Sequence, residues 1–513
     1  MRLAAAAAVV ACALAVSAPT TVRASDLLHA AAANDRSAAV ALLDAGADPT
    51  ATEPNGTTVL HWAVYHDDEE LVGRLLAAGA DPAAVNAYGS SPMLEAAVKG
   101  NSRVMKALLD AGANVESPND DGQTALMVVA RSSNLDAARL LLERGANPNA
   151  VERWRGQTAL MWAAAQRQAA MIRLLLEHGA DPDVRSLLNR WERQVSAEPR
   201  AQWRPPGGWT ALMYAARHGC VDCAVALVEA GADPDIANEE GVTPLIVAIT
   251  NLHFDVARAL LEHGANPNKW DWRGRTSLYM AVDMNTLPHG GWPDRPSTDR
   301  TTSLELIEIL LEAGANPNAQ LKLNPMWRAI QDDRGKDLLL SIGATPLLRA
   351  AKGFDVPAIE LLLRYGAHPD LPNLGQITRT QIGGVTPLMA AAGLDSRPTD
   401  TRGTFDTPDV EQRSIAALKA LLAGGADINA RDDHGRTALH AAASWGWTEV
   451  AKFLVENGAD LHAQDADGVL PVDAALGRMQ GGRLVGGAPV HAHAAAVLRE
   501  WMVERGDPAD GTR

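Results

Sequence analysis

Short segments with apolar residues at helical spacing recur in pairs along most of the chain. In one such pair, Thr243 and Pro244 open the first segment, because threonine caps a helix and proline fits its first position. The second segment, 255–261, repeats apolar residues with a helical period. Gly264 ends it, since glycine adopts the left-handed conformation cheaply. The pattern predicts two short helices followed by a projecting hairpin at 266–273.

Gly-Ala followed by Asp, Asn or His marks the end of each pair. The interval between successive copies is 33 or 34 residues in six cases and 50, 52, 52 or 59 in the others. A basal period that returns after each interruption indicates a repeat array with insertions. The eleven copies begin at Gly46, Gly79, Gly112, Gly145, Gly179, Gly231, Gly264, Gly314, Gly366, Gly425 and Gly458.

The first helix of several units carries variants of the motif Thr-Pro-Leu-His-x-Ala, at 58–63, 210–215, 386–391 and 437–442. The period and this motif resemble the ankyrin repeat family. His is often replaced by Met at the fourth place, which predicts different local hydrogen bonds. The resemblance implies an all-α solenoid of stacked helix-turn-helix units with projecting β-hairpin loops. It covers residues 25–506, as about eleven to twelve units.

The N-terminal residues 1–24 predict a secretory signal peptide. Arg2 precedes an apolar stretch from Leu3 to Ala18, and a small-residue cleavage pattern ends at Ala24. The stretch is too short for a comfortable permanent membrane anchor. A lipoprotein signal around Cys12 is a weaker alternative. The tail 507–513 is polar, and we expect it to be flexible.

Insertions interrupt the array, and most lie between residues 183 and 412. Loop insertions in a solenoid often line a working face, although neutral drift would also produce them. They lengthen hairpins or separate the two helices of a unit at 183–207, 285–302, 319–342, 371–383, 395–412 and 477–491.

Tryptophan outnumbers phenylalanine, 13 to 4, and much of it falls outside the predicted helices, often beside arginine. The family's hairpin tips and first helices line a concave binding face. Trp and Arg dominate interface hot spots, so the resemblance places a partner-binding surface at these tips. The alternative is that these rings pack inward to fix the long loops. The candidate partner-binding residues are Trp154, Arg155, Trp209, Trp270, Trp272, Arg273 and Arg275.

Motifs for hydrolysis, phosphate binding or haem attachment are missing from the sequence. His491 and His493 fit solvated loop histidines better than a metal site, because no Cys or carboxylate cluster accompanies them. Cys220 and Cys223 lie where a second helix starts. Three interpretations of this pair stay open: buried thiols in the core, a local structural disulfide, or a redox role.

The net charge of −16 repels phosphate backbones and anionic membranes, which excludes nucleic acid as a general partner. We expect a monomeric, non-catalytic protein-binding scaffold, periplasmic or secreted, with no cofactor, no metal and no stable membrane span. The family resemblance implies a protein partner but does not identify it. One alternative is glycan or small-ligand binding through exposed Trp rings. A second is thiol–disulfide chemistry at Cys220 and Cys223.

Overall fold

The computed structural model describes residues 24–188, 207–286, 297–323, 339–340, 342–375, 383–394, 396, 407–479 and 490–505. The predicted signal peptide (apart from Ala24), the tail and the centres of the insertions lie outside these residues. The chain divides into two compact units, 1–153 and 154–513. Each unit consists of helical pairs, and no strand is assigned within the described ranges.

In the first unit, the first helices pack against one another and each also packs against the second helix of its own pair. The helices are α1 (Ala24–Ala32), α2 (Arg36–Asp44), α3 (Val59–Tyr65), α4 (Glu69–Ala77), α5 (Pro92–Lys99), α6 (Ser102–Asp110), α7 (Ala125–Ser132) and α8 (Leu135–Glu143).

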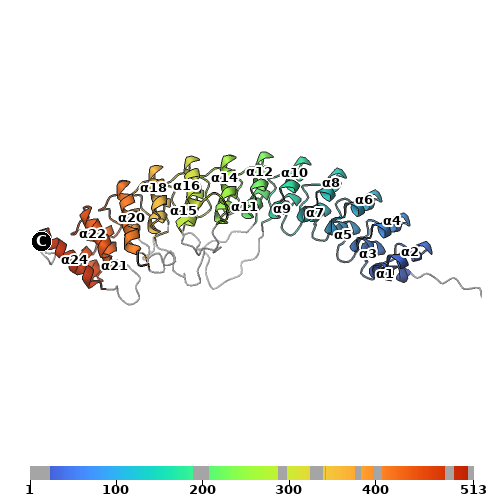
Figure 1. Cartoon of the computed structure of the whole chain (residues 1–513), viewed down its shortest axis with the longest axis horizontal. Coiled ribbons are helices and arrows are strands. Elements are labelled where there is room, and N and C mark those ends of the chain that lie inside the picture. The colour runs from blue at the N-terminus through green and yellow to red at the C-terminus, as the bar shows by residue number, and fades with distance from the viewer. Residues whose placement is uncertain are drawn as a thin grey trace, which may run out of the picture. The chain divides into compact units, whose positions relative to one another are not determined.

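The second unit repeats this arrangement, with first and second helices forming two rows (Figure 1). Its helices are α9 (Ala159–Ala165), α10 (Ala169–Glu177), α11 (Ala211–Arg217), α12 (Val221–Glu229), α13 (Pro244–Thr250), α14 (Phe254–Glu262), α15 (Ser277–Thr286), α16 (Ser303–Glu312), α17 (Pro346–Lys352), α18 (Val356–Arg364), α19 (Pro387–Ala391), α20 (Val410–Ala423), α21 (Ala438–Trp445), α22 (Thr448–Glu456), α23 (Pro471–Ala475) and α24 (Ala492–Glu504). Neither row could bury its apolar stripe alone, so stacking supplies the core.

The local signals act as predicted. The Thr243 side chain caps α13 by accepting the Ile246 N–H, and Pro244 occupies the first turn. Gly264 follows α14 with φ +86°, the left-handed conformation that glycine favours. The hairpin loops contain isolated β-bridges, such as Trp270 with Thr276, in place of longer strands.

The motif histidine links neighbouring repeats where it is present. In α21, the backbone N–H of Thr437 donates to His440 Nδ1. His440 Nε2 lies 3.0 Å from the carbonyl oxygen of Val469 in the next repeat. His61 makes the same pair of contacts, with Thr58 and Ser90. Burial lowers the pKa of both rings. A neutral imidazole therefore serves as both cap and bridge between repeats.

A row of Asp and Asn side chains, the corner ladder, joins the turns that follow successive second helices. Asn268 accepts the Asn316 N–H through Oδ1 and donates through Nδ2 to the carbonyl oxygen of Gly314. Asp183 accepts the Asp233 N–H in the same way, but a carboxylate cannot donate the second bond. Asparagine therefore suits a ladder position better than aspartate does.

Replacing Asp183 with asparagine should raise the free energy of unfolding by about 1 kcal/mol at neutral pH. The new amide can donate to the carbonyl of Gly231, as Asn268 donates to Gly314. Burial raises the pKa of Asp183, and the charges of Asp233 and Asp181 raise it further, against the lowering effect of the Asp233 N–H. Folding therefore disfavours the ionised form of the Asp183 carboxyl group.

Urea unfolding of wild type and variant measures this gain. It should shrink toward acid pH, because a group with a raised folded pKa stabilises the fold when protonated. Glu360→Gln, which removes one charge from the exposed face of α18, is the control and should change stability by less than about 0.5 kcal/mol. A loss of stability in the asparagine variant would refute the ladder argument.

Candidate functional site

Several hairpin tips are tight turns stabilised by one acidic or amide side chain. Asp271 Oδ1 accepts the backbone N–H groups of Arg273 and Arg275. Its Oδ2 binds the Arg275 guanidinium at 2.6 Å. Gly274 completes the turn with φ +83°. The carboxylate satisfies donors that would otherwise be unpaired, so the tip presents its remaining side chains from a fixed backbone.

Backbone hydrogen bonds connect neighbouring tips of the second unit. The N–H of Leu187 donates to the carbonyl of Arg155. Trp272 donates to Glu240, and Lys322 donates to Arg273, each 2.8 Å. Side chains on adjacent tips are therefore held in register, although the hairpins are far apart in sequence.

The predicted Trp residues lie on this row of tips, with different exposure. Trp154 is 69% exposed and Trp270 is 52% exposed. Trp272 and Trp209 are half-buried, and the Trp209 ring packs 5.4 Å from that of Tyr214. Exposed indole rings offer large contact areas at low entropic cost. Trp191, Trp203 and Trp292, which the sequence also places in insertions, lie outside the described residues.

Two cations cover ring faces at the most aromatic tip. Lys322 Nζ lies 4.1 Å from the Trp270 ring centroid, and Arg273 Cζ lies 4.3 Å from that of Trp272. Burial lowers the pKa of Arg273, and the nearby charge of Arg275 lowers it further. We call Trp270, Trp272, Arg273 and Lys322 the Trp270 cluster. It combines exposed aromatic surface with positioned donors.

The predicted residues are not all brought together. Trp154 and Arg155 are exposed on one tip, Trp209 lies on the neighbouring tip, and the tip at 238–241 separates Trp209 from the Trp270 cluster. Arg275 binds Asp271 within its own turn, which stabilises the tip.

Three further tip residues were missed by sequence reasoning. Lys322 joins Trp270 across an insertion, and Leu187 and Leu374 are exposed large apolar side chains. Leucine in a loop carried no signal. Lys322 lies within the insertion at 319–342, which concealed its register relative to Trp270.

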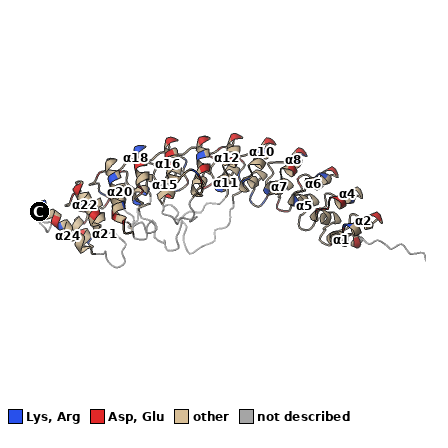
Figure 2. Ribbon diagram, viewed as in Figure 1, with Lys and Arg blue, Asp and Glu red and all other residues tan. Residues whose placement is uncertain are grey.

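Charge is distributed unevenly within the second unit. Figure 2 shows carboxylates at the C-terminal ends of second helices, where α10, α12, α14 and α16 each end in glutamate. The tips at 269–275 and 320–323 carry Lys269, Arg273, Arg275 and Lys322, with Asp271 as their only carboxylate. Glu239 and Glu240 lie on the preceding tip. The Trp270 cluster is thus locally cationic in an acidic chain.

Cys220 and Cys223 are joined by a disulfide, with an S–S distance of 1.96 Å. Cys220 is 6% exposed and Cys223 is fully buried. Cys223 occupies the core position that Val256 fills in the next repeat. Of the three interpretations that the sequence left open, the structure therefore contains the disulfide.

The histidine pair of the last repeat is split between two settings. His491 precedes α24, whereas His493 lies exposed on that helix, so it is not the loop residue that the sequence suggested.

Across the described ranges, no group of three or more His, Cys, Asp or Glu side chains could hold a metal. Within the same ranges, every helix is too short or too polar to cross a bilayer.

Comparison with known proteins gives partial matches. Over 98 residues the chain is 39% identical to the Notch protein of Drosophila melanogaster, covering 18% of this chain and 3% of Notch. It is 43% identical over 60 residues to human protein phosphatase 1 regulatory subunit 27, covering 12% of this chain and 39% of the subunit. Each match thus spans well under two thirds of the relative.

Two solved structures are similar over about half of the chain. The human ASB11 ankyrin repeat domain is 23% identical with a TM-score of 0.39, covering 47% of this chain and 98% of that domain. The Bcl-3 ankyrin repeat domain is 28% identical with a TM-score of 0.38, and the match covers 46% of this chain and 97% of that domain.

The family model of ankyrin repeats matches residues 27–119, 111–186, 212–321 and 410–478, which together exceed half of the chain. The helical pairs, the threonine caps and the glycine-ended second helices occur throughout these ranges. This chain belongs to the ankyrin repeat family, whose repeats generally mediate protein–protein interaction.

Proposed function

We propose that this protein is a non-catalytic scaffold that binds a partner protein through the hairpin tips of its second unit, centred on the Trp270 cluster. The observation that carries the proposal is a half-exposed Trp270 with Lys322 fixed over its ring. Trp and Arg are among the side chains that contribute most to protein interfaces, and the cluster offers Trp270, Trp272 and Arg273. The tip-to-tip hydrogen bonds reduce the entropy that binding would cost.

The same geometry disfavours the two alternatives. A sugar stacks on an open ring face, and the cations over Trp270 and Trp272 leave no more than one face of each ring for such stacking. An enzyme that exchanges disulfides with protein substrates needs a sulfur that another protein can reach, whereas Cys220 is only 6% exposed and Cys223 is fully buried. Binding a protein partner, by contrast, depends on neither an open ring face nor an accessible sulfur.

We place this binding outside the cytoplasm as part of the proposal. The pattern of residues 1–24 supports export, and a disulfide persists in an oxidising compartment. The chain from Ser25 onward is then the form that meets its partner.

Alanine at both Trp270 and Trp272 should weaken partner binding by roughly 30-fold or more, because a hot-spot residue contributes about 2 kcal/mol or more. The chain from Ser25, immobilised, is exposed to cell-envelope and cytosolic extracts, and the recovered protein is identified and titrated against both forms. Tyr88→Ala is the matched control, since it removes an exposed aromatic from a tip of the first unit.

Circular dichroism confirms that each variant is folded. Equal affinity of the double variant and wild type would remove the Trp270 cluster from the function. Recovery of the partner from the cytosolic extract alone would overturn the extracytoplasmic part of the proposal.

A further inference from the structure

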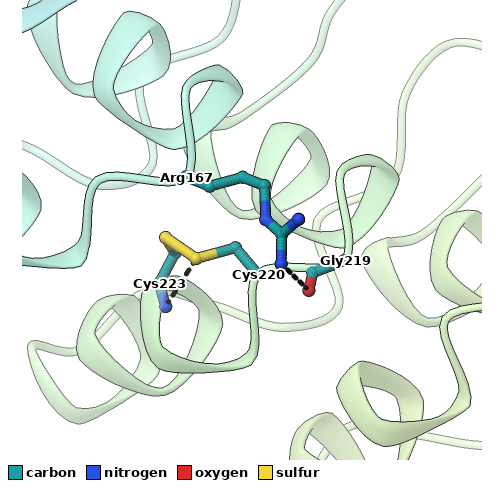
Figure 3. The surroundings of a disulfide bond; sticks show 4 residues. All are labelled: Arg167, Gly219, Cys220 and Cys223. Carbon is teal, nitrogen blue, oxygen red and sulfur yellow. Dashed lines mark hydrogen bonds between the residues drawn. A yellow bond between two sulfur atoms is a disulfide. The ribbon is translucent and has the colours of Figure 1, made fainter. Parts of the chain in front are cut away.

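The disulfide occupies a position that has a recurring role in the other repeats. The residue before each second helix is often Asp or Asn, whose side chain accepts an N–H of the first turn. Asp68 accepts the Leu71 N–H, and Asn101 accepts the Val104 N–H. At α12 the residue is Cys220, and its sulfur lies 3.2 Å from the Cys223 nitrogen (Figure 3). A sulfur therefore stands where an oxygen normally caps the helix.

The surroundings of this cap favour a negative sulfur. The start of α12 directs backbone N–H groups and the positive end of the helix dipole toward Cys220. Arg167 donates to the carbonyl of Gly219, the residue next to Cys220, and its side chain reaches toward this turn (Figure 3). Burial lowers the pKa of His218, and the charges of Arg217, His253 and Arg167 lower it further.

Arg167 and His253 both lie against Gly219, the residue that precedes Cys220. Asp222, in the first turn of α12, is the one carboxylate of the segment 217–223. An electropositive helix start stabilises a thiolate, and a stabilised thiolate makes a disulfide easier to reduce.

We propose that Cys220–Cys223 is a reducible helix cap and that Cys220 is a thiol-modification site for small thiols of the glutathione type. An incoming thiolate attacks Cys220 Sγ, because Cys220 keeps 6% of its surface exposed whereas Cys223 is fully buried. The Sγ–Sγ bond breaks, a mixed disulfide forms on Cys220, and the electron pair leaves on Cys223, which takes a proton. A second thiolate attacks the sulfur of the bound thiol, which releases the oxidised small thiol and leaves the Cys220 thiolate to accept the Cys223 N–H.

Site-resolved labelling tests where exchange begins. The folded variants Cys223→Ala and Cys220→Ala are incubated with oxidised glutathione, and the adduct is mapped by mass spectrometry. Cys220 in the first variant should react at least roughly tenfold faster than Cys223 in the second. Equal rates, or no adduct on either folded chain, would overturn the proposal.

A second measurement tests the cap itself and does not depend on either alanine variant folding. Dithiothreitol should lower the thermal midpoint of wild type by a few degrees. It should leave the double variant Cys220→Asn/Cys223→Val unchanged, because that variant has no disulfide to reduce. Its asparagine cap and core valine copy the arrangement of Asn101 and Val104 at the start of α6. The same response in both chains would show that the disulfide is not the cap.

Discussion

Replacing Asp432 with alanine should lower the free energy of unfolding of the second unit by about 3–5 kcal/mol. The Asp432 and Arg436 side chains are both fully buried, and their charged atoms lie 2.7 Å apart. Asp432 Oδ1 also accepts the backbone N–H groups of His434 and Arg436. Removing the carboxylate takes away the charge and the hydrogen-bond acceptor that Asp432 gives the buried guanidinium of Arg436, and such a loss is costly in a low-dielectric interior.

Asp465→Ala provides a control within the same molecule. Asp465 Oδ1 accepts the N–H groups of Asp467 and Val469 in the equivalent turn of the next repeat, where Val469 replaces the arginine. Its loss should cost only about 1–3 kcal/mol, for two hydrogen bonds. Urea unfolding of both variants measures the difference. Equal losses would mean that the buried charge of Arg436 is not what makes Asp432 important.

Alanine at Gly274 should destabilise the second unit by about 2–5 kcal/mol and also displace the Trp270 cluster. Gly274 has φ +83°, which costs an L-residue about 1–2 kcal/mol. A Cβ there would lie 2.6 Å from the backbone nitrogen of Lys322 on the next tip. Relieving that overlap costs a further 1–3 kcal/mol or so and strains the bond from Lys322 to Arg273.

Gly468→Ala separates the two contributions. Gly468 occupies the same turn position with φ +78°, and nothing lies within 4 Å of the Cβ that alanine would add. It should show the conformational cost alone. Thermal or urea unfolding gives both values, and Trp fluorescence reports the displaced ring of Trp270. If the two glycine variants were equally stable, the tips at 274 and 322 would not be in contact in solution.

The fold was predictable because its signals are local and repeated. Thr243 and Gly264 act within their own helices, so sequence alone identifies what they do. The regular period supplies the stacking partner. Cys220 was recognisable as the residue that opens α12 for the same reason.

The site was only partly predictable, because it depends on contacts across insertions. The pairing of Lys322 with Trp270 joins residues in separate repeats with an insertion between them. The pairing of Arg275 with Asp271 could have been found, since the same spacing recurs at Arg436 and Asp432. Exposure of Leu187 or Leu374 depends on the packing around each tip, which residue type does not determine.

Site-specific photo-crosslinking tests the central claim most directly. Trp270 is replaced by p-benzoylphenylalanine in one chain, and Glu360, on the exposed face of α18, is replaced in another. Irradiation in envelope extract should give a covalent adduct to a single protein from position 270 and none from position 360. Adducts that are equal from both positions, or that form only from position 360, would contradict a partner-binding surface at the Trp270 cluster.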